Sequence, residues 1–239
     1  MDFFFACIRF EVFSDASALS AAESLYSQRS SISFSEAETV LADIGAGSEN
    51  ELAQQKYSST MKAFMGTDVM TWIDKNPELY RAINDYVDDP PDGSDPLWET
   101  TNAKLNRGKA LSAREADFKN RLEKALAVLP KYNCICFRGG ALSKKGVESY
   151  REGSVITMAG FYSTSIDPNI AYQFARQGSQ DSFQTIFVIN VHSGSPMSSF
   201  HQFHWTEFEV LMKAGEKVRV EKVLMDQNQK KAIIFLEQI

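Results

Sequence analysis

The sequence contains few cysteines, no long hydrophobic run and no excess of basic residues. Its longest unbroken apolar run extends from Phe3 to Ile8, whereas a helix that crosses a membrane needs roughly 20 apolar residues. Asp2 stands where a secretory signal carries basic residues, and Arg9 and Glu11 interrupt the apolar stretch. We therefore expect neither a membrane span nor a secretory signal.

The charge balance and the cysteine count argue against two further classes of protein. With 25 Lys and Arg against 31 Asp and Glu, the net charge is −6, which disfavours binding to the phosphate backbone of nucleic acids. Three cysteines are too few for a disulfide framework, so we expect a reducing compartment. Cys134 and Cys136 form a lone C-x-C, and we expect them to pack as small apolar side chains.

The first 50 residues differ in composition from the rest of the chain. An aromatic-rich start gives way to a stretch that is rich in Ser, Ala and Glu. We interpret residues 1–50 as a loosely attached leader. Within it, Ser33 with Glu36, or Ser35 with Glu38, forms a capping box that predicts the start of a helix.

Residues 51–130 show the hydrophobic period of helices. Asn76 and Pro77 supply an N-cap and a first helical residue, after which apolar residues recur at the spacing of one buried helix face: Leu79, Tyr80, Ile83, Tyr86 and Val87. The segment 88–96 contains three prolines and a glycine, which predicts a loop. Ser112 and Glu115 form a capping box before a second helix.

Residues 131–239 consist mainly of short runs rich in β-branched and aromatic residues, which are typical of strands. The predicted strands are Cys134–Phe137, Val155–Met158, Thr185–Val191, Glu207–Met212, Lys217–Val223 and Ala232–Leu236. Asp167 and Pro168 predict the start of one short helix among them. Helices first and strands after indicate an α+β fold, in which helices cover a mainly antiparallel sheet.

Three short motifs in the second half of the chain carry candidate chemistry. In the first, Arg138 leaves the end of an apolar strand and precedes Gly139 and Gly140, which allow a ligand to approach the backbone closely. Arginine suits a diphosphate, because its guanidinium stays charged and donates two hydrogen bonds to anionic oxygens. Taken alone, the motif is better explained by an arginine at a sheet edge before a tight turn.

The second and third motifs contribute hydroxyls and carboxylates. In the run Ser163, Thr164 and Ser165, the two serines point to one face of a strand, where they can brace a polar side chain or a sugar. Glu207 and Glu209 lie two positions apart, so in a strand both carboxylates point to one face and can serve one reaction centre. An exposed strand explains either motif taken alone.

The ordered set of motifs is far more specific than any one of them. Arg138, then Ser163-Thr164-Ser165, then Glu207-x-Glu209, resembles the arginine-type mono-ADP-ribosyltransferases of the R-S-E class. That family includes bacterial toxins, type III effectors and phage enzymes. The helical segment Trp72–Tyr86 also resembles the family's N-terminal helical lobe.

The resemblance covers residues 51–239 and implies a single catalytic domain. A helical lobe over residues 51–130 would pack on a β-rich core over residues 131–239. That core would be split into two sheets, with the substrate NAD in the cleft between them. The reaction of the family needs no metal.

The resemblance also implies roles for individual residues in NAD binding. Arg138 would hold the phosphates, and the Gly139 backbone would contact the nicotinamide amide. Ser163, together with Thr164 and Ser165, would brace the catalytic glutamate. Phe174 would flank the nicotinamide, and Arg176 lies near the place of a second phosphate-binding arginine.

The two glutamates would divide the chemistry between them. Glu209 would be the catalytic glutamate, because a carboxylate beside the ribose stabilises the positive charge that builds up as the bond to nicotinamide breaks. Glu207 would enable transfer to arginine, because a guanidinium is a poor nucleophile until a nearby base orients it or takes its proton.

The segment from Gly194 to Trp205 resembles the recognition loop of the family. Phe203, His204 and Trp205 are expected to contact a target protein. His201 and His204 form an H-x-x-H without acidic or cysteine ligands beside them, so we expect no metal site. Gly194-Ser-Pro-Met197 replaces the Gly-x-x-Ile of many relatives, a conservative change that leaves the strand intact.

Three functions remain open at this point. The first is transfer of ADP-ribose from NAD to an arginine of a target protein, by a monomer. The second is NAD glycohydrolysis, and the third is a binding module that keeps the scaffold but has lost turnover. The resemblance suggests a bacterial effector or a phage-encoded host modifier that acts in a reducing cytoplasm. Residues 1–50 would then serve as a translocation signal or bind a secretion chaperone.

Overall fold

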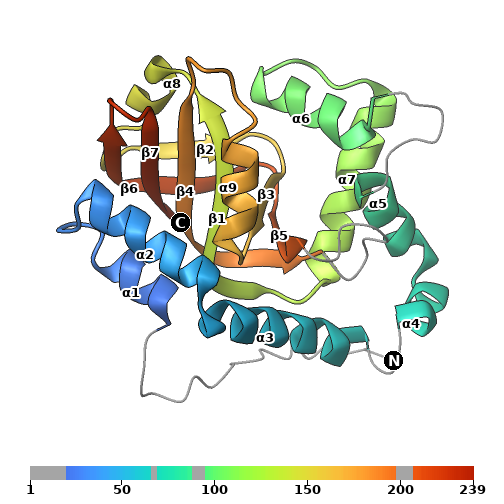
Figure 1. The fold of residues 1–239 in the computed structure, drawn as a ribbon. Coiled ribbons are helices and arrows are strands. Elements are labelled where there is room, and N and C mark those ends of the chain that lie inside the picture. The colour runs from blue at the N-terminus through green and yellow to red at the C-terminus, as the bar shows by residue number, and fades with distance from the viewer. Residues whose placement is uncertain (1–19, 66–68, 88–94, 198–206) are drawn as a thin grey trace.

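The computed structural model describes residues 20–65, 69–87, 95–197 and 207–239 (Figure 1). The helices are α1 Ala21–Ser27, α2 Phe34–Ala46, α3 Ser48–Met65, α4 Val69–Lys75, α5 Pro77–Val87, α6 Leu97–Asn106, α7 Ala113–Val128, α8 Lys144–Glu148 and α9 Pro168–Ala175. The strands are β1 Tyr132–Leu142, β2 Val155–Met158, β3 Tyr162–Ser165, β4 Phe183–Pro196, β5 Glu209–Met212, β6 Glu216–Asp226 and β7 Lys231–Gln238. Most helices precede the strands, and the predicted α+β class is confirmed.

Side-chain caps determine where several helices begin. Ser33 with Glu36 caps α2, and Ser112 with Glu115 caps α7, both as complete capping boxes. The side chain of Asp167 accepts a hydrogen bond from an amide in the first turn of α9, and Pro168 is the first residue of that helix. These predicted helix starts are confirmed, as is the start of α5 at Pro77.

The strands form one hydrogen-bonded sheet in the order β1-β3-β5-β4-β7-β6-β2. Because β1 also pairs with β4, the strands β1, β3, β5 and β4 close into a ring, from which β7, β6 and β2 extend. The described pairs are antiparallel except for β4 with β7. The two predicted sheets are thus joined along β1 and β4.

The long strands send alternate side chains into two hydrophobic cores. On β1, Ile135 and Phe137 pack with α1, α2 and α9, whereas Cys136 packs on the opposite face with α3, α5 and α7. Cys136 is fully buried and Cys134 packs against the same core, so both pack as predicted. Figure 1 shows α1 and α2 beside β6 and β7, and α5 to α7 at the other end of the sheet.

Residues 20–46 are an integral part of the fold. Leu25 of α1 and Leu41 of α2 are completely buried against Phe235 of β7 and Ala171 of α9. The prediction of a loosely attached leader is therefore wrong for these residues, because two amphipathic helices bury their apolar faces on the sheet. Residues 1–19 lie outside the described part of the chain.

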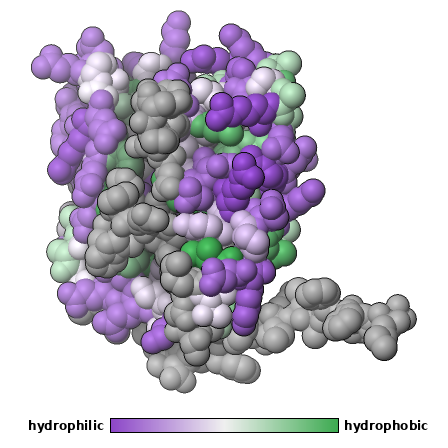
Figure 2. Space-filling view, turned by 90° about the vertical axis from the view of Figure 1, so that its right-hand side faces the viewer, coloured by the Kyte–Doolittle hydropathy of each residue, from purple (hydrophilic) through white to green (hydrophobic). Residues whose placement is uncertain are grey.

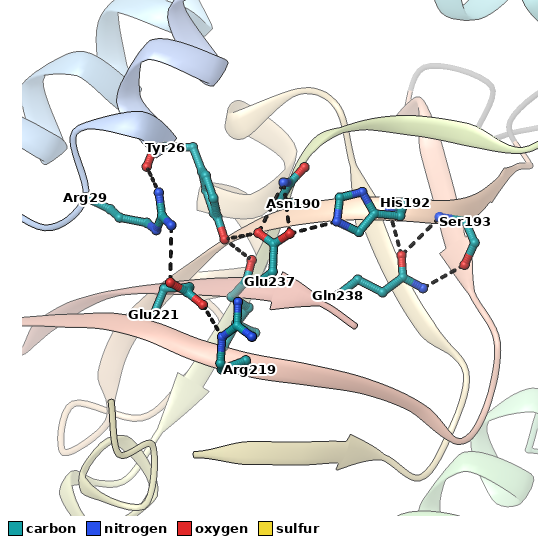
Figure 3. A network of polar contacts seen from close by, with 10 residues as sticks. Tyr26, Arg29, Asn190, His192, Ser193, Arg219, Glu221, Glu237 and Gln238 are labelled. Atoms are coloured by element: carbon teal, nitrogen blue, oxygen red, sulfur yellow. Dashed lines mark hydrogen bonds and ion pairs between the residues drawn. The ribbon is translucent and has the colours of Figure 1, made fainter. Parts of the chain in front are cut away.

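A polar network fastens α1 to the end of the sheet (Figure 3). The Tyr26 hydroxyl lies 2.7 Å from the Glu237 carboxylate, which also accepts hydrogen bonds from Asn190 and lies 2.7 Å from His192 Nε2. Arg29 stacks on the Tyr26 ring and pairs with Glu221 of β6 at 3.2 Å; that carboxylate also accepts from Arg219. The network links α1 with β4, β6 and β7.

The outer face of the helical lobe is mainly hydrophilic, with a few small hydrophobic patches between hydrophilic residues (Figure 2). Within the described residues, no helix is both long enough and apolar enough to cross a membrane.

Candidate functional site

Glu209, the first residue of β5, lies at the centre of a buried polar cluster. Only 3% of its surface is exposed, and its Oε1 accepts a hydrogen bond from the Tyr86 hydroxyl at 2.6 Å. The Ser163 side chain and Arg138 are both close enough to lower the pKa of that phenol. The structure therefore brings Arg138, Ser163 and Glu209 together around one tyrosine hydroxyl.

The other two hydroxyls of the Ser-Thr-Ser motif fix the main chain around Glu209. Thr164 donates to the carbonyl oxygen of Val210, and Ser165 donates to that of Glu207, both at 2.6 Å. Strands β3 and β5 pair in register, with Ser165 opposite Glu209. The motif thus holds the backbone on both sides of the glutamate.

Arg138 is anchored at two points. Its Nη1 donates to the Ser163 carbonyl oxygen at 2.5 Å, and its guanidinium lies 4.4 Å above the centre of the Tyr162 ring. No carboxylate of the described residues forms an ion pair with it. A half-buried cation without an anionic partner in the protein is suited to an anionic ligand.

The cluster keeps its phenols protonated. Burial raises the pKa of Tyr86 well above its ordinary value, and the Glu209 carboxylate raises it further, while Arg138 opposes them. Burial also raises the pKa values of Tyr150 and Tyr162, which both feel the charge of Arg138. At neutral pH these hydroxyls are therefore hydrogen-bond donors and not anions.

Strand β5 begins at Glu209 and not at Glu207, as the sequence predicted. Phe208 has a φ of 47°, in the left-handed region, and its ring packs edge-on against Tyr57 at a centroid distance of 5.9 Å. Because this residue interrupts the extended chain, the alternation that would place both carboxylates on one strand face does not apply. That part of the prediction is wrong, and Glu207 lies just before the strand with its side chain half-buried.

Gly139 allows a close approach, but the approaching group is part of the protein. A Cβ added to this residue would lie 1.7 Å from the carbonyl oxygen of Ala171 in α9. The neighbouring Gly140 is different, because a Cβ there would be 3.8 Å from Phe187, an ordinary contact. Gly139 is therefore required for the packing of α9 on β1, in addition to any contact with nicotinamide.

Phe174 lies in the last turn of α9, and Arg176 follows the helix as its C-cap residue. Phe174 has 45% of its surface exposed, as expected for an aromatic that could stack on a ligand. Arg176 is exposed and lines a groove of about 540 Å³ between α2 and α9, together with Tyr172 and Lys231. Among the described residues, no hydrogen bond or ring contact joins either side chain to the Glu209 cluster.

The predicted recognition-loop residues Phe203, His204 and Trp205 lie outside the described residues, as does His201. Gly194 lies near the end of β4, opposite Tyr132 of β1, and Met197 is buried directly after β4. In the described ranges, no group of three or more His, Cys, Asp or Glu side chains lies close enough together to hold a metal ion.

Two tyrosines contact Glu209 that the sequence did not identify as site residues. Tyr86 was expected only as part of an apolar helix face, yet its hydroxyl binds the carboxylate; Tyr57 of α3 donates to the Glu209 carbonyl oxygen. The available signal was chemical, because a buried tyrosine hydroxyl needs a hydrogen-bond partner. The sequence did not show which residue that partner would be.

Comparison with known proteins identifies relatives of this architecture. No protein-family model matches the chain. A stretch of 139 residues, 58% of the chain, is 34% identical to a protein of Mycobacterium avium (strain 104) whose provisional name is NAD(+)–arginine ADP-ribosyltransferase Mav. The matched stretch spans 16% of the length of that protein.

Solved structures extend the likeness to most of the fold. The Vis toxin, an ADP-ribosyltransferase from Vibrio splendidus, superposes with a TM-score of 0.60 at 21% identity, covering 80% of this chain and 85% of Vis. The type III effector XopAI of Xanthomonas axonopodis pv. citri, in truncated form, gives a TM-score of 0.55 at 18% identity, covering 93% of this chain and 89% of XopAI.

The XopAI match bears on the first 50 residues. Residues 51–239 make up about four-fifths of the chain, so a match of 93% includes part of the segment before residue 51. This agrees with the burial of α1 and α2 on the sheet. The resemblance predicted from the motifs is confirmed, and the chain has the fold of the bacterial ADP-ribosyltransferases.

Proposed function

We propose that this protein transfers ADP-ribose from NAD to an arginine side chain of a target protein and releases nicotinamide. The observation that carries the proposal is the buried Glu209 carboxylate, held by Tyr86 beside Ser163 and Arg138. The Mycobacterium avium relative has the provisional name NAD(+)–arginine ADP-ribosyltransferase, which supports the same chemistry.

The residues present fit a dinucleotide. Arg138 carries a full positive charge without a carboxylate partner among the described residues, and its position is fixed by the Ser163 carbonyl and the Tyr162 ring. Such a fixed guanidinium can bind a diphosphate with two parallel hydrogen bonds. Phe174, exposed on α9, would provide an apolar face for the nicotinamide.

Glu209 would stabilise the reaction where charge develops. As the bond between ribose and nicotinamide breaks, positive charge builds up on the sugar, and a carboxylate in a site shielded from water stabilises that charge more than it stabilises the ground state. The hydrogen bonds of Thr164 and Ser165 to the neighbouring backbone keep the carboxylate from moving away.

Glu207 would act on the arginine acceptor. It precedes β5, two residues before Glu209, so a second carboxylate lies next to the start of that strand. A carboxylate there can orient the guanidinium of a target and accept its proton. The Vis toxin, which shares the fold, has been solved in complex with agmatine, a small guanidinium compound.

NAD glycohydrolysis is the second candidate, and the residue that separates the two activities is Glu207. A target protein bound through residues 203–205, delivery into a host cytoplasm, a monomeric state and a role of the first residues in secretion belong to the same proposal. XopAI is a type III effector by name, which supports delivery by a specialised secretion machine.

The test measures nicotinamide release from NAD, with and without agmatine, for the wild type, Glu207→Gln and Glu209→Gln. We expect wild type to label agmatine and Glu207→Gln to lose labelling while it still hydrolyses NAD. Glu209→Gln should lose both activities by about 10²- to 10³-fold, the usual cost of removing one group that stabilises transition-state charge. Glu148→Gln, an exposed substitution on α8, is the control.

Two outcomes would contradict the proposal. If the wild type releases nicotinamide but never labels agmatine or a protein, the protein is an NAD glycohydrolase. If it neither cleaves nor binds NAD, the scaffold serves as a binding module.

A further inference from the structure

The contact between Tyr86 and Glu209 joins two parts of the molecule that are distant in sequence. Tyr86 lies in the last turn of α5 in the helical lobe, and Glu209 begins β5 in the core. Both residues are buried, at 8% and 3% exposure, and the phenol is 2.6 Å from Oε1. At this distance the hydroxyl is a strong, charge-assisted donor to the carboxylate.

From this geometry we infer that Tyr86 is a positioning residue, which fixes the orientation and the ionised state of the Glu209 carboxylate and so makes turnover depend on the helical lobe. The inference rests on the proposed function, since it assigns a role within the same site.

The position of the phenol is itself well determined. Its ring contacts the Trp98 ring of α6 edge to face, at a centroid distance of 6.4 Å. The neighbouring residues Ala82 and Ile83 anchor α5 in the core that includes Phe118 of α7. Three helices of the lobe therefore hold the donor in place, and the carboxylate takes the rotamer that meets it.

The protonation state of Tyr86 suits this role. Because burial and the adjacent carboxylate raise its pKa, the phenol stays a donor over the whole range in which an enzyme of this kind would work. Ser163 and Arg138 lie near the same hydroxyl and lower its pKa, but they do not outweigh burial and the Glu209 carboxylate. A hydrogen bond to an ionised carboxylate favours the charged form, which is the form that stabilises positive charge on the ribose.

Tyr57 provides an internal contrast. Its hydroxyl donates to the backbone carbonyl of Glu209 and not to the carboxylate. This bond ends on the main chain, so it holds the strand and not the group that ionises. A Tyr57→Phe variant should therefore lower stability without moving the pH dependence of turnover.

The experiment compares nicotinamide release by the full chain in the wild type, Tyr86→Phe and Tyr26→Phe. Tyr26→Phe is the matched control, because it removes a phenol–glutamate hydrogen bond of similar length that lies outside the site. We expect Tyr86→Phe to lower kcat by about 10- to 100-fold, as for other residues that orient a functional group. KM for NAD should change little, and the acidic limb of the kcat profile should move to higher pH.

A structural role alone would give a different pattern. If Tyr86→Phe keeps the wild-type kcat and pH profile and only lowers the melting temperature, as Tyr26→Phe is expected to do, the positioning role is refuted. The same conclusion follows if Tyr57→Phe shifts the acidic limb as strongly as Tyr86→Phe.

A second measurement separates this inference from the proposed function. Carboxyl carbons of labelled glutamates are titrated by NMR in the wild type and in Tyr86→Phe, with Glu209 assigned by its loss in Glu209→Gln. If the Glu209 titration moves to higher pH in Tyr86→Phe while neither the wild type nor any variant cleaves NAD, the proposed function fails. The effect of Tyr86 on the carboxylate is then still supported. If the titration does not move, the inference fails even in an active enzyme.

Discussion

Among the described residues, two tyrosine–glutamate pairs connect helices to the sheet, and their surroundings differ in one instructive way. Tyr26 of α1 binds Glu237, and Tyr86 of α5 binds Glu209, at 2.7 and 2.6 Å. Around the first pair the cations have anionic partners, since Arg29 pairs with Glu221. Around the second pair, Arg138 has no carboxylate partner among the described residues.

The difference separates a structural contact from a functional one. A network whose charges are all neutralised internally has no need of a ligand, and it contributes to the stability of the fold. A half-buried guanidinium that has no carboxylate partner among the described residues is costly to maintain, unless a ligand uses its charge. The state of the neighbouring cations, and not the tyrosine–glutamate contact itself, therefore distinguishes the candidate site.

The largest loss of stability is expected from a substitution of Gly139, which follows Arg138 in β1 and packs against α9. In Gly139→Ala the new methyl group would overlap the carbonyl of Ala171, so α9 must move from β1. Because the overlap is with a backbone atom, we expect the free energy of unfolding to fall by about 3 kcal/mol or more, the upper end of the range for overpacked sites. Urea denaturation measures it.

Gly140→Ala is the control for that variant, because its methyl group would make only an ordinary contact with Phe187. If both variants have wild-type stability and only Gly139→Ala weakens NAD binding, the glycine serves the ligand and not the packing of α9.

The sequence predicted elements whose local signals agree with the tertiary fold. The capping boxes at Ser33 and Ser112 and the Asp167-Pro168 pair set the helix starts, and side-chain caps act over only a few residues. The motif residues Arg138 and Ser163 were also predicted to lie near Glu209, through a resemblance to a known family.

What the sequence did not reveal depends on contacts between distant segments. The burial of α1 and α2 follows from the match of their apolar faces to β7 and α9, which composition does not encode. The start of β5 depends on Phe208, whose left-handed backbone accompanies a ring contact with Tyr57, far away in sequence. The role of Tyr86 likewise requires the position of Glu209.

An intermediate effect is expected from the contact that fastens α1. Tyr26→Phe removes the donor to Glu237 and to the Leu236 carbonyl oxygen, which lies 2.9 Å from the hydroxyl. Because these acceptors are largely buried, we expect the free energy of unfolding to fall by about 1–3 kcal/mol. Nicotinamide release at a temperature well below unfolding should stay at the wild-type level.

The distinction between a structural pair at Tyr26 and a functional pair at Tyr86 would be refuted if Tyr26→Phe lost activity while remaining folded. In that case α1 would belong to the catalytic machinery, and the two pairs would be coupled through the sheet. A calorimetric scan beside the rate measurement separates the two cases.

The smallest effect concerns the pH dependence of stability at Glu237. Burial alone raises the pKa of this carboxyl, but the hydrogen bonds from Tyr26, His192 and Asn190 outweigh it, so the pKa is lowered from its ordinary value of 4.5. A carboxyl with a lowered pKa in the folded state stabilises the protein above its unfolded-state value, and this contribution is lost as the pH falls through the folded-state value.

Glu237→Gln should therefore lose less stability than the wild type as the pH falls below about 4.5. Urea midpoints at pH 7, 5, 4 and 3, measured for both proteins, give the two slopes. Glu148→Gln is the control, since that exposed glutamate makes only a loose 3.9 Å pair with Lys144 and should keep the wild-type slope. Equal slopes for Glu237→Gln and the wild type would mean that the hydrogen bonds of Glu237 do not stabilise its charged form. The contrast between the two pairs would then rest only on Arg138, for which the described part of the chain offers no carboxylate partner.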